Sequence, residues 1–117
     1  MRLGDIMETA VDTIGLEDRA ELAWERMRLG RFHHFVVMND RAVVGVLSDR
    51  DLGGARGARL REGRQVADLM TLNVVTATPT TTVREAANLM RGRSIGCLPV
   101  VDKGSLRGII TVTDLWN

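Results

Sequence analysis

Aromatic residues and cysteine are scarce in this chain of 117 residues. It has no tyrosine, two phenylalanines and two tryptophans, which excludes a binding surface built mainly from aromatic side chains. The single cysteine, Cys97, has no partner for an internal disulfide, and this usage is typical of a reducing compartment. We therefore expect a cytoplasmic protein.

Long apolar runs and an excess of one charge are also missing. The longest uncharged stretch, Leu69–Val83, contains Pro79 and six threonines, so no segment approaches the roughly 18 apolar residues that a membrane span needs. The N-terminal MRLGDIMETA has no apolar core of a secretory signal. Sixteen basic and fifteen acidic side chains leave a net charge of +1, which argues against nucleic-acid binding. We expect neither a nucleic-acid partner nor direct insertion into a membrane.

What the chain does contain is an internal repeat. The segment Gly45–Leu52 (GVLSDRDL) resembles Gly108–Leu115 (GIITVTDL) at an offset of 63 residues. At the same offset Asp5–Met7 (DIM) resembles Asp68–Met70 (DLM), and eleven residues in all are identical without a gap. A constant offset over the whole length indicates a duplication.

The repeat divides the chain into three parts. We assign residues 1–54 to the first copy and residues 66–117 to the second. Residues 55–65 form a linker rich in glycine and arginine, whose four arginines we expect to be solvated: Arg56, Arg59, Arg61 and Arg64. The sequence ends at Asn117, where the second copy's final helix should begin, so we expect either a fragment of a larger protein or a domain-swapped end.

Each copy predicts the same order of elements: strand, helix, two strands joined as a hairpin, and a final helix. The predicted strands are Val11–Ile14, Phe35–Met38 and Val43–Leu47, and in the second copy Val74–Ala77, Leu98–Val101 and Leu106–Ile110. A copy of about fifty residues is too small to be robust alone. We therefore expect one mixed α+β, sandwich-like domain, in which two strand–helix–strand–strand–helix repeats are related by a pseudo-two-fold axis and form two equivalent clefts.

The predicted helices begin at pairs with the spacing of a capping box, Asp18 with Glu21 and Thr82 with Glu85. Apolar residues then recur along one helix face in each copy: Ala20, Ala23, Trp24 and Met27, and Val83, Ala86, Ala87 and Met90. We interpret four methionines at matching positions as core packing: Met7, Met27, Met70 and Met90. We also expect a homodimer, because packing within two copies leaves apolar surface on these helix faces for a partner to cover. The residues concerned are Trp24, Met27, Val83 and Met90.

Several motifs recur in order in both copies. Each opens with D-[IL]-M and closes with a glycine, two apolar residues and [ST]-x-x-D-L. A unit of this kind resembles a cystathionine-β-synthase (CBS) domain, and two in tandem resemble a Bateman module. The second copy matches along its whole length, whereas the first departs at Phe35-Val36-Val37, where family members often have proline, and at His33-His34.

The resemblance implies a regulatory, non-catalytic module for signal transduction that needs no cofactor. Similar modules commonly bind AMP, ADP, ATP or S-adenosylmethionine between their repeats. They typically dimerise into a flat disc of four repeats and pass ligand occupancy to an enzyme, channel or transporter. The alternative is a structural or dimerisation module whose clefts stay empty.

Two pairs of residues carry the chemistry for a nucleotide, Ser48 with Asp51 and Thr111 with Asp114. An ionised carboxylate accepts hydrogen bonds from both hydroxyls of a ribose, and a hydroxyl three residues earlier is placed to donate to a sugar or phosphate oxygen. Arg50 adds a phosphate partner in the first copy only. The same spacing also serves to cap a helix, so the pattern alone leaves both roles open.

In similar modules the other repeat holds the adenine, against its first strand and the start of its second. This implies a first cleft formed by Ser48, Arg50 and Asp51 with Val75, Thr76, Ile95, Gly96 and Cys97. It implies a second cleft formed by Thr111 and Asp114 with Thr13, Phe32, His33 and His34. Asp12 also falls in the second cleft and is unfavourable near a phosphate, so we favour the first.

We expect no catalytic and no metal-binding residues. His33 and His34 are adjacent on a predicted strand and point to opposite faces, so they are poorly placed to chelate one ion. No histidine or cysteine cluster accompanies them. Cys97 lies in an apolar run and is typical of a small buried hydrophobe rather than a nucleophile.

Overall fold

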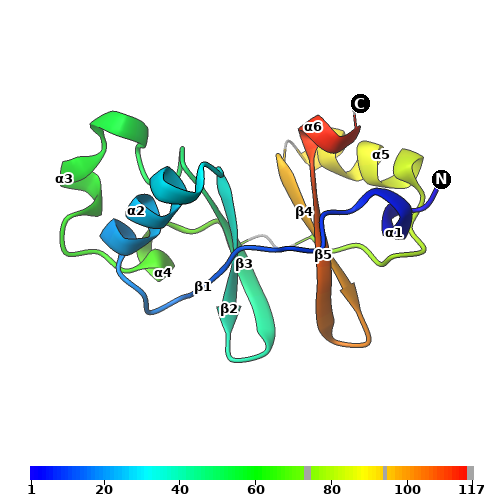
Figure 1. Ribbon diagram of the computed structural model, residues 1–117, viewed down its shortest axis with the longest axis horizontal. Coiled ribbons are helices and arrows are strands. Elements are labelled where there is room, and N and C mark those ends of the chain that lie inside the picture. The colour runs from blue at the N-terminus through cyan, green and yellow to red at the C-terminus, as the bar shows by residue number, and fades with distance from the viewer. Residues whose placement is uncertain (73–74, 94, 116–117) are drawn as a thin grey trace. The chain divides into compact units, whose positions relative to one another are not determined.

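The computed structural model describes residues 1–72, 75–93 and 95–115 and divides into two compact units (Figure 1). The central unit is Asp12–Val74, and the terminal unit joins the two ends of the chain, Met1–Val11 and Val75–Asn117. Both units combine helices with a β-hairpin, so the mixed α+β fold with two repeats is as predicted. Within the described ranges no helix is both long and apolar enough to cross a bilayer.

The central unit contains a three-stranded sheet. Its strands are β1 (Thr13–Gly15), β2 (His34–Asn39) and β3 (Ala42–Ser48). They lie in the order β1-β2-β3, with β1 parallel and β3 antiparallel to β2. The helical elements are α2 (Ala20–Gly30), the 3-10 helix η1 (Gly54–Arg56), α3 (Ala58–Arg61) and α4 (Val66–Leu69).

The terminal unit repeats this plan with a two-stranded sheet. It consists of α1 (Leu3–Ile6), α5 (Val83–Arg93), β4 (Cys97–Asp102), β5 (Ser105–Thr111) and α6 (Val112–Leu115). Of the strand predicted over 74–77, the described residues 75–77 form one parallel bridge, between Ala77 and Val100. Val74, where that strand was predicted to begin, lies outside the described residues.

The two hairpins form where the predicted strands place them. Asp40 in the first turn, and Lys103 and Gly104 in the second, have positive φ angles of 54°, 51° and 79°, which is the backbone that two-residue hairpin turns require. Both hairpins also shift register at the same point of the repeat, between Val37 and Met38 and between Val100 and Val101. The duplication therefore preserves the hairpin down to its irregularity.

The short helix that opens each copy packs in the unit formed mainly by the other copy: α1 in the terminal unit and α4 in the central unit. Leu3 of α1 is fully buried in the terminal core, and Val66 of α4 is fully buried in the central core. Short antiparallel bridges join the following residues to the same unit, Glu8 to Ile109 and Thr71 to Val46. The copies of the sequence repeat and the compact units are thus offset along the chain.

The D-[IL]-M motif, which recurs in the two copies, has the same local role in each. The motif's aspartate caps its short helix: the Asp5 carboxylate accepts the Arg2 N–H at 3.1 Å, and Asp68 accepts the Gln65 N–H at 2.8 Å. The motif's methionine packs over a glycine in the second strand of a hairpin, β5 for Met7 and β3 for Met70. A Cβ on Gly108 would lie 2.7 Å from the sulfur of Met7, and Met70 covers Gly45 in the same way.

Two apolar clusters form the cores. The central one joins α2 to the sheet through Ala20, Ala23, Met27, Phe35, Val37 and Leu47, and the terminal one includes Ala86, Met90, Leu98, Val100 and Ile110. Alanine at the contact lets each helix approach its sheet closely. Met27 and Met90 are each 3% exposed, and the half-buried Met7 and Met70 pack against the cores, which confirms the packing interpretation of the four methionines. The expectation that these two lie uncovered for a partner is wrong, because their own units bury them.

The two copies differ in how their main helix begins. In the second, the Glu85 N–H donates to the Thr82 hydroxyl at 3.1 Å and the Thr82 N–H donates to the Glu85 carboxylate at 3.0 Å, so this capping box is confirmed. In the first, the prediction is wrong. The Asp18 carboxylate accepts the Gly15 N–H at 2.8 Å and closes a turn, and α2 begins one residue later with Arg19 at its N-cap.

The linker is folded, and the prediction of a solvated linker arginine is wrong for Arg61. Its side chain is buried, and Nη1 donates to the carbonyl oxygens of Leu52 and Gly54, both at 2.7 Å. Its guanidinium stacks 4.1 Å from the centre of the Trp24 ring. Arg61 therefore fastens the segment after β3 to helix α2, while Arg59 on the same short helix is exposed.

We predict that Arg61→Met lowers the free energy of unfolding by about 3 kcal/mol, because two carbonyl groups lose a charged donor and Trp24 loses its stacked cation. The matched variant Arg59→Met removes an exposed arginine and should change stability by less than about 0.5 kcal/mol. Urea denaturation followed by circular dichroism measures both. Equal effects of the two substitutions would contradict this role of Arg61.

Candidate functional site

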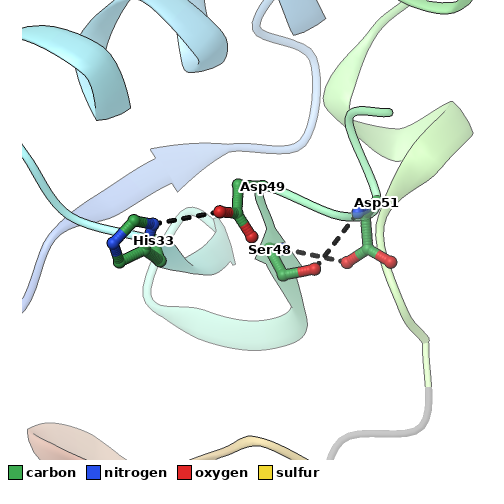
Figure 2. Close-up of polar contacts among 4 residues, drawn as sticks. All are labelled: His33, Ser48, Asp49 and Asp51. Atoms are coloured by element: carbon green, nitrogen blue, oxygen red, sulfur yellow. Dashed lines mark hydrogen bonds and ion pairs between the residues drawn. The ribbon is translucent and has the colours of Figure 1, made fainter. Parts of the chain in front are cut away.

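The chain makes a closed turn directly after β3, at the predicted pair of Ser48 and Asp51. The Ser48 N–H donates to Oδ2 of Asp51 at 2.9 Å, and the Asp51 N–H donates to the Ser48 hydroxyl at 3.1 Å (Figure 2). The hydroxyl of Thr71 also reaches Oδ2 of Asp51, at 3.5 Å. Oδ1 of Asp51 makes no hydrogen bond within the described part of the chain. The turn therefore holds the carboxylate by one oxygen and leaves the other unused.

The second copy repeats this arrangement at the end of β5. Both the N–H and the hydroxyl of Thr111 donate to Oδ2 of Asp114, at 2.8 and 3.1 Å. Oδ1 of Asp114 likewise has no hydrogen bond among residues 1–72, 75–93 and 95–115. All four side chains of the two turns are half-buried. In both copies the carboxylate accepts the N–H of the residue three positions earlier through one oxygen. A helix, α6, follows this turn directly only in the second copy, so the Ser48 turn of the first copy does not cap a helix.

The start of the preceding strand lies beside each turn. Pairing of β2 with β3 sets His34 opposite Ser48, and pairing of β4 with β5 sets Cys97 opposite Thr111. The backbone then closes equivalently in the two copies, since the Asp49 N–H donates to the His33 carbonyl at 3.1 Å and the Val112 N–H donates to the Gly96 carbonyl at 3.2 Å. Each unit therefore brings together predicted site residues of its own sheet.

The predicted clefts each draw residues from both units. The central unit holds Thr13, Phe32, His33, His34, Ser48, Arg50 and Asp51, and the terminal unit holds Val75, Thr76, Ile95, Gly96, Cys97, Thr111 and Asp114. Five of these are exposed: Thr13, His33, Arg50, Thr76 and Gly96. Only Cys97 is buried, and burial raises the pKa of its thiol to about 12. A thiol that stays protonated at neutral pH is a poor nucleophile, which agrees with the interpretation of Cys97 as a buried hydrophobe.

The two adjacent histidines have different surroundings. His33 is exposed, and its Nδ1 lies 3.0 Å from Oδ2 of Asp49 (Figure 2). His34 is half-buried; burial lowers the pKa of its imidazole, His33 lowers it further, and Asp49 and Asp51 act in the opposite direction. Among the described residues no group of three histidine, cysteine or acidic side chains is placed to hold a metal ion.

One feature of the central unit was missed by the sequence analysis. A cavity of about 270 Å³ lies between α2 and the entrance to β2, and it is lined by Trp24, Met27, Arg28, Arg31, Phe32, His33 and Asp49. Only Phe32 and His33 were among the predicted site residues. The available signal was that tryptophan, phenylalanine and histidine, all rare in this chain, fall within ten residues of one another.

Comparison with known proteins gives consistent matches. The family model of the CBS domain matches residues 3–55 and again residues 66–115. A CBS domain-containing protein of Dictyostelium discoideum is 35% identical over 96% of this chain and 86% of its own length. Inosine-5′-monophosphate dehydrogenase of Nitrosopumilus maritimus is 36% identical over 70% of this chain but only 16% of the enzyme.

Solved structures share the fold. The structure of CBSX2 in complex with AMP has a TM-score of 0.83 and 27% identity, and the match covers 98% of this chain and 93% of that one. The CBS domain pair of protein MJ0100, in complex with 5′-methylthioadenosine and S-adenosyl-L-methionine, has a TM-score of 0.87 and 23% identity, covering 99% and 97%.

We predict that His34 makes the protein less stable in mild acid. Since the pKa of His34 is lower in the folded chain than the ordinary value of 6.5, the unfolded chain binds more protons as the pH falls through 6.5. When the pH is lowered from about 7.5 to about 5.5, the urea midpoint of unfolding should fall more for the wild type than for His34→Gln. Equal pH dependence of the wild type and His34→Gln would refute the assignment.

Proposed function

The chain belongs to the CBS domain family, and from this we propose that it is a non-catalytic regulatory module that binds an adenosine-containing ligand. The candidate ligands are AMP, ADP, ATP and S-adenosylmethionine. Ligand occupancy would be passed to a partner protein or an attached domain, such as an enzyme, transporter or channel. The proposed location is the cytoplasm, and no cofactor is required.

The observation that carries this proposal is that the same turn, closed around an aspartate carboxylate, occurs in both copies. Asp51 and Asp114 each accept hydrogen bonds of their own turn through one carboxylate oxygen, and the second oxygen has no hydrogen bond among the described residues. A carboxylate fixed in this way is preorganised to accept the two hydroxyls of a ribose, and little ordering is left to oppose binding. The complex of the structural relative CBSX2 with AMP supports this class of ligand.

The proposed clefts keep the predicted residues. The first joins Ser48, Arg50 and Asp51 to Val75, Thr76, Ile95, Gly96 and Cys97, and the second joins Thr111 and Asp114 to Thr13, Phe32, His33 and His34. The exposed Arg50 favours an anionic ligand in the first cleft. The carboxylate of Asp12 disfavours one in the second.

The similarity to inosine-5′-monophosphate dehydrogenase supports a regulated enzyme as one kind of partner. It covers only 16% of that enzyme, so most of the enzyme lies outside the similar segment. A module of this kind would act on such a partner through ligand-dependent differences in contact rather than by chemistry of its own.

A second candidate is a structural or dimerisation module with empty clefts. It is favoured by the hydrogen bonds of the Ser48 turn, in which the N–H of each residue donates to the side chain of the other. The two candidates differ in what the loss of a carboxylate charge does, because a cap needs only an acceptor whereas a ribose diol gains from a charged one.

We predict that Asp51→Asn lowers the affinity for AMP by about ten- to a hundredfold, because charge-assisted acceptance from the ribose is lost. Asp114→Asn should lower the affinity for AMP less than Asp51→Asn does, since the second cleft lacks a counterpart of Arg50. Both variants should keep wild-type stability, because asparagine accepts the same turn hydrogen bond. Calorimetric titration with AMP and ATP measures the affinities.

The 2′-deoxy form of AMP is the matched control ligand. It should bind the wild type more weakly than AMP and should lose less on Asp51→Asn, since one of the two hydroxyls is already missing. Equal AMP affinities in the wild type and both variants would rule out the carboxylates as ribose ligands. Absence of binding in every chain would favour the structural module.

We further predict a homodimer with twice the chain mass of 12.9 kDa. Leu22 and Leu29 are 42% and 80% exposed, and a spacing of seven residues puts them on one face of α2. Light scattering at micromolar concentration should give about 26 kDa for the wild type and a smaller mass for Leu29→Asp. The comparison variant Leu72→Asp, also at an exposed leucine, should stay dimeric. A wild-type mass of one chain would contradict the dimer.

A further inference from the structure

The cavity of about 270 Å³ lies wholly within the central unit. Four of its lining residues come from α2 and its C-cap, Trp24, Met27, Arg28 and Arg31, and the others are Phe32, His33 and Asp49. The pair of His33 with Asp49, seen in Figure 2, forms one edge. The carboxylates of Asp51 and Asp114 are not among the lining residues, so the cavity is not the ribose-binding part of either proposed cleft.

The walls of the cavity are apolar and held in place. Met27 is buried, and the Phe32 ring packs edge-on against Phe35 with a centroid distance of 5.0 Å and an angle of 88°. The ring of Phe32 also occupies the space beside Gly30, where a Cβ would lie 2.5 Å from its edge. The Trp24 ring carries the guanidinium of Arg61 at 4.1 Å. Two fixed aromatic rings and a thioether suit a flat aromatic group.

The rim of the cavity carries an unbalanced positive charge. Asp49 is paired with His33 at 3.0 Å. Arg28 and Arg31 are both exposed, and in the part of the chain that the structure describes neither forms an ion pair. Arg31 is set at the rim by the backbone, because it caps α2 in the left-handed conformation at φ 57° and donates its N–H to the Met27 carbonyl. Two guanidinium groups beside an aromatic pocket suit a carboxylate or phosphate group.

The internal repeat shows that this combination belongs to one copy. At an offset of 63, Met27 and Arg28 meet the same residues. The other five lining positions change from an aromatic or ionisable residue to a small or aliphatic one: Trp24, Arg31, Phe32, His33 and Asp49 correspond to Ala87, Ser94, Ile95, Gly96 and Val112. Every aromatic residue of the cavity is therefore specific to the first copy.

We propose that this cavity is a second ligand site, which takes a small aromatic anion with its ring between Trp24 and Phe32 and its anionic group at Arg28 and Arg31. The volume lies just below the usual range of small-molecule pockets, so the ligand is a single substituted ring rather than a nucleotide. The site shares Phe32 and His33 with the second proposed cleft. It goes beyond the proposed function because its other lining residues belong to neither cleft and the carboxylates of Asp51 and Asp114 do not line it.

Trp24 itself reports the binding. In a Trp116→Phe background it is the only tryptophan of the chain, and its fluorescence is followed during titration with benzoate and with phenyl phosphate. At least one of the two should produce a saturable change. Benzamide has the ring without the charge and should bind at least about tenfold more weakly than benzoate, and acetate, which has the charge without the ring, should have no effect.

Substitutions test the two halves of the site. Arg31→Asn keeps the left-handed backbone, which asparagine tolerates, and should weaken the better probe about three- to tenfold. Gly30→Ala displaces the Phe32 ring and should weaken it as well. Arg41→Asn, which removes an exposed arginine in the β2–β3 turn, is the matched control and should change nothing. AMP binding, measured in parallel, should be unaffected by Arg31→Asn, so the failure of one site is distinguished from the failure of the other.

The proposal is overturned if neither benzoate nor phenyl phosphate changes Trp24 fluorescence at concentrations up to about 10 mM. It is also overturned if benzamide binds as well as benzoate, or if Arg41→Asn weakens the probe as much as Arg31→Asn, since the guanidinium at the rim would then have no specific part.

Discussion

The register of the two hairpins is the constraint on which the cores and the candidate sites depend. In β2 it turns Phe35 and Val37 toward the central core, and in the same step it sets His34 opposite Ser48. A shift by one residue would reverse the faces of the whole strand. The positive φ angles at Asp40, Lys103 and Gly104 hold this register at the hairpin turns. Both copies keep the same bulge, so the carboxylate turns that follow β3 and β5 leave their sheets at equivalent points.

Capping and ligand binding are not exclusive roles for the carboxylates that follow the hairpins. One oxygen of Asp51 completes a turn whose donors are the Ser48 N–H and the Thr71 hydroxyl. This contact orients the group, and the second oxygen stays available for a hydrogen-bond donor. A side chain whose rotamer is already fixed loses little entropy when it binds. Structural use of one oxygen therefore strengthens the case for ligand contact by the other.

Features that depend on neighbouring residues were predictable from the sequence, whereas those that depend on tertiary contacts were not. The hairpins and the capping box at Thr82 follow from short-range spacing and are present as expected. At Asp51 the spacing left helix capping and ligand contact open. Asp18 was misassigned because the Gly15 N–H competes for the same carboxylate. Burial of Arg61 depends on carbonyl groups seven and nine residues away and on the Trp24 ring, and no composition rule identifies such partners. The cavity beside Trp24 likewise needs α2 folded against β2, so only its rare residue types were visible.

The exchange of opening helices sets an order in which the chain becomes able to fold as it is synthesised. The central unit has all of its parts once residues up to Thr71 have emerged, because α4 and the bridge to Val46 complete it. Helix α1 precedes the central unit in the sequence, but it buries Leu3 against residues of β4 and β5 that emerge about a hundred positions later. Such long-range closure is slow. The segment of α1 must therefore wait to pack until β4 and β5 have also left the ribosome.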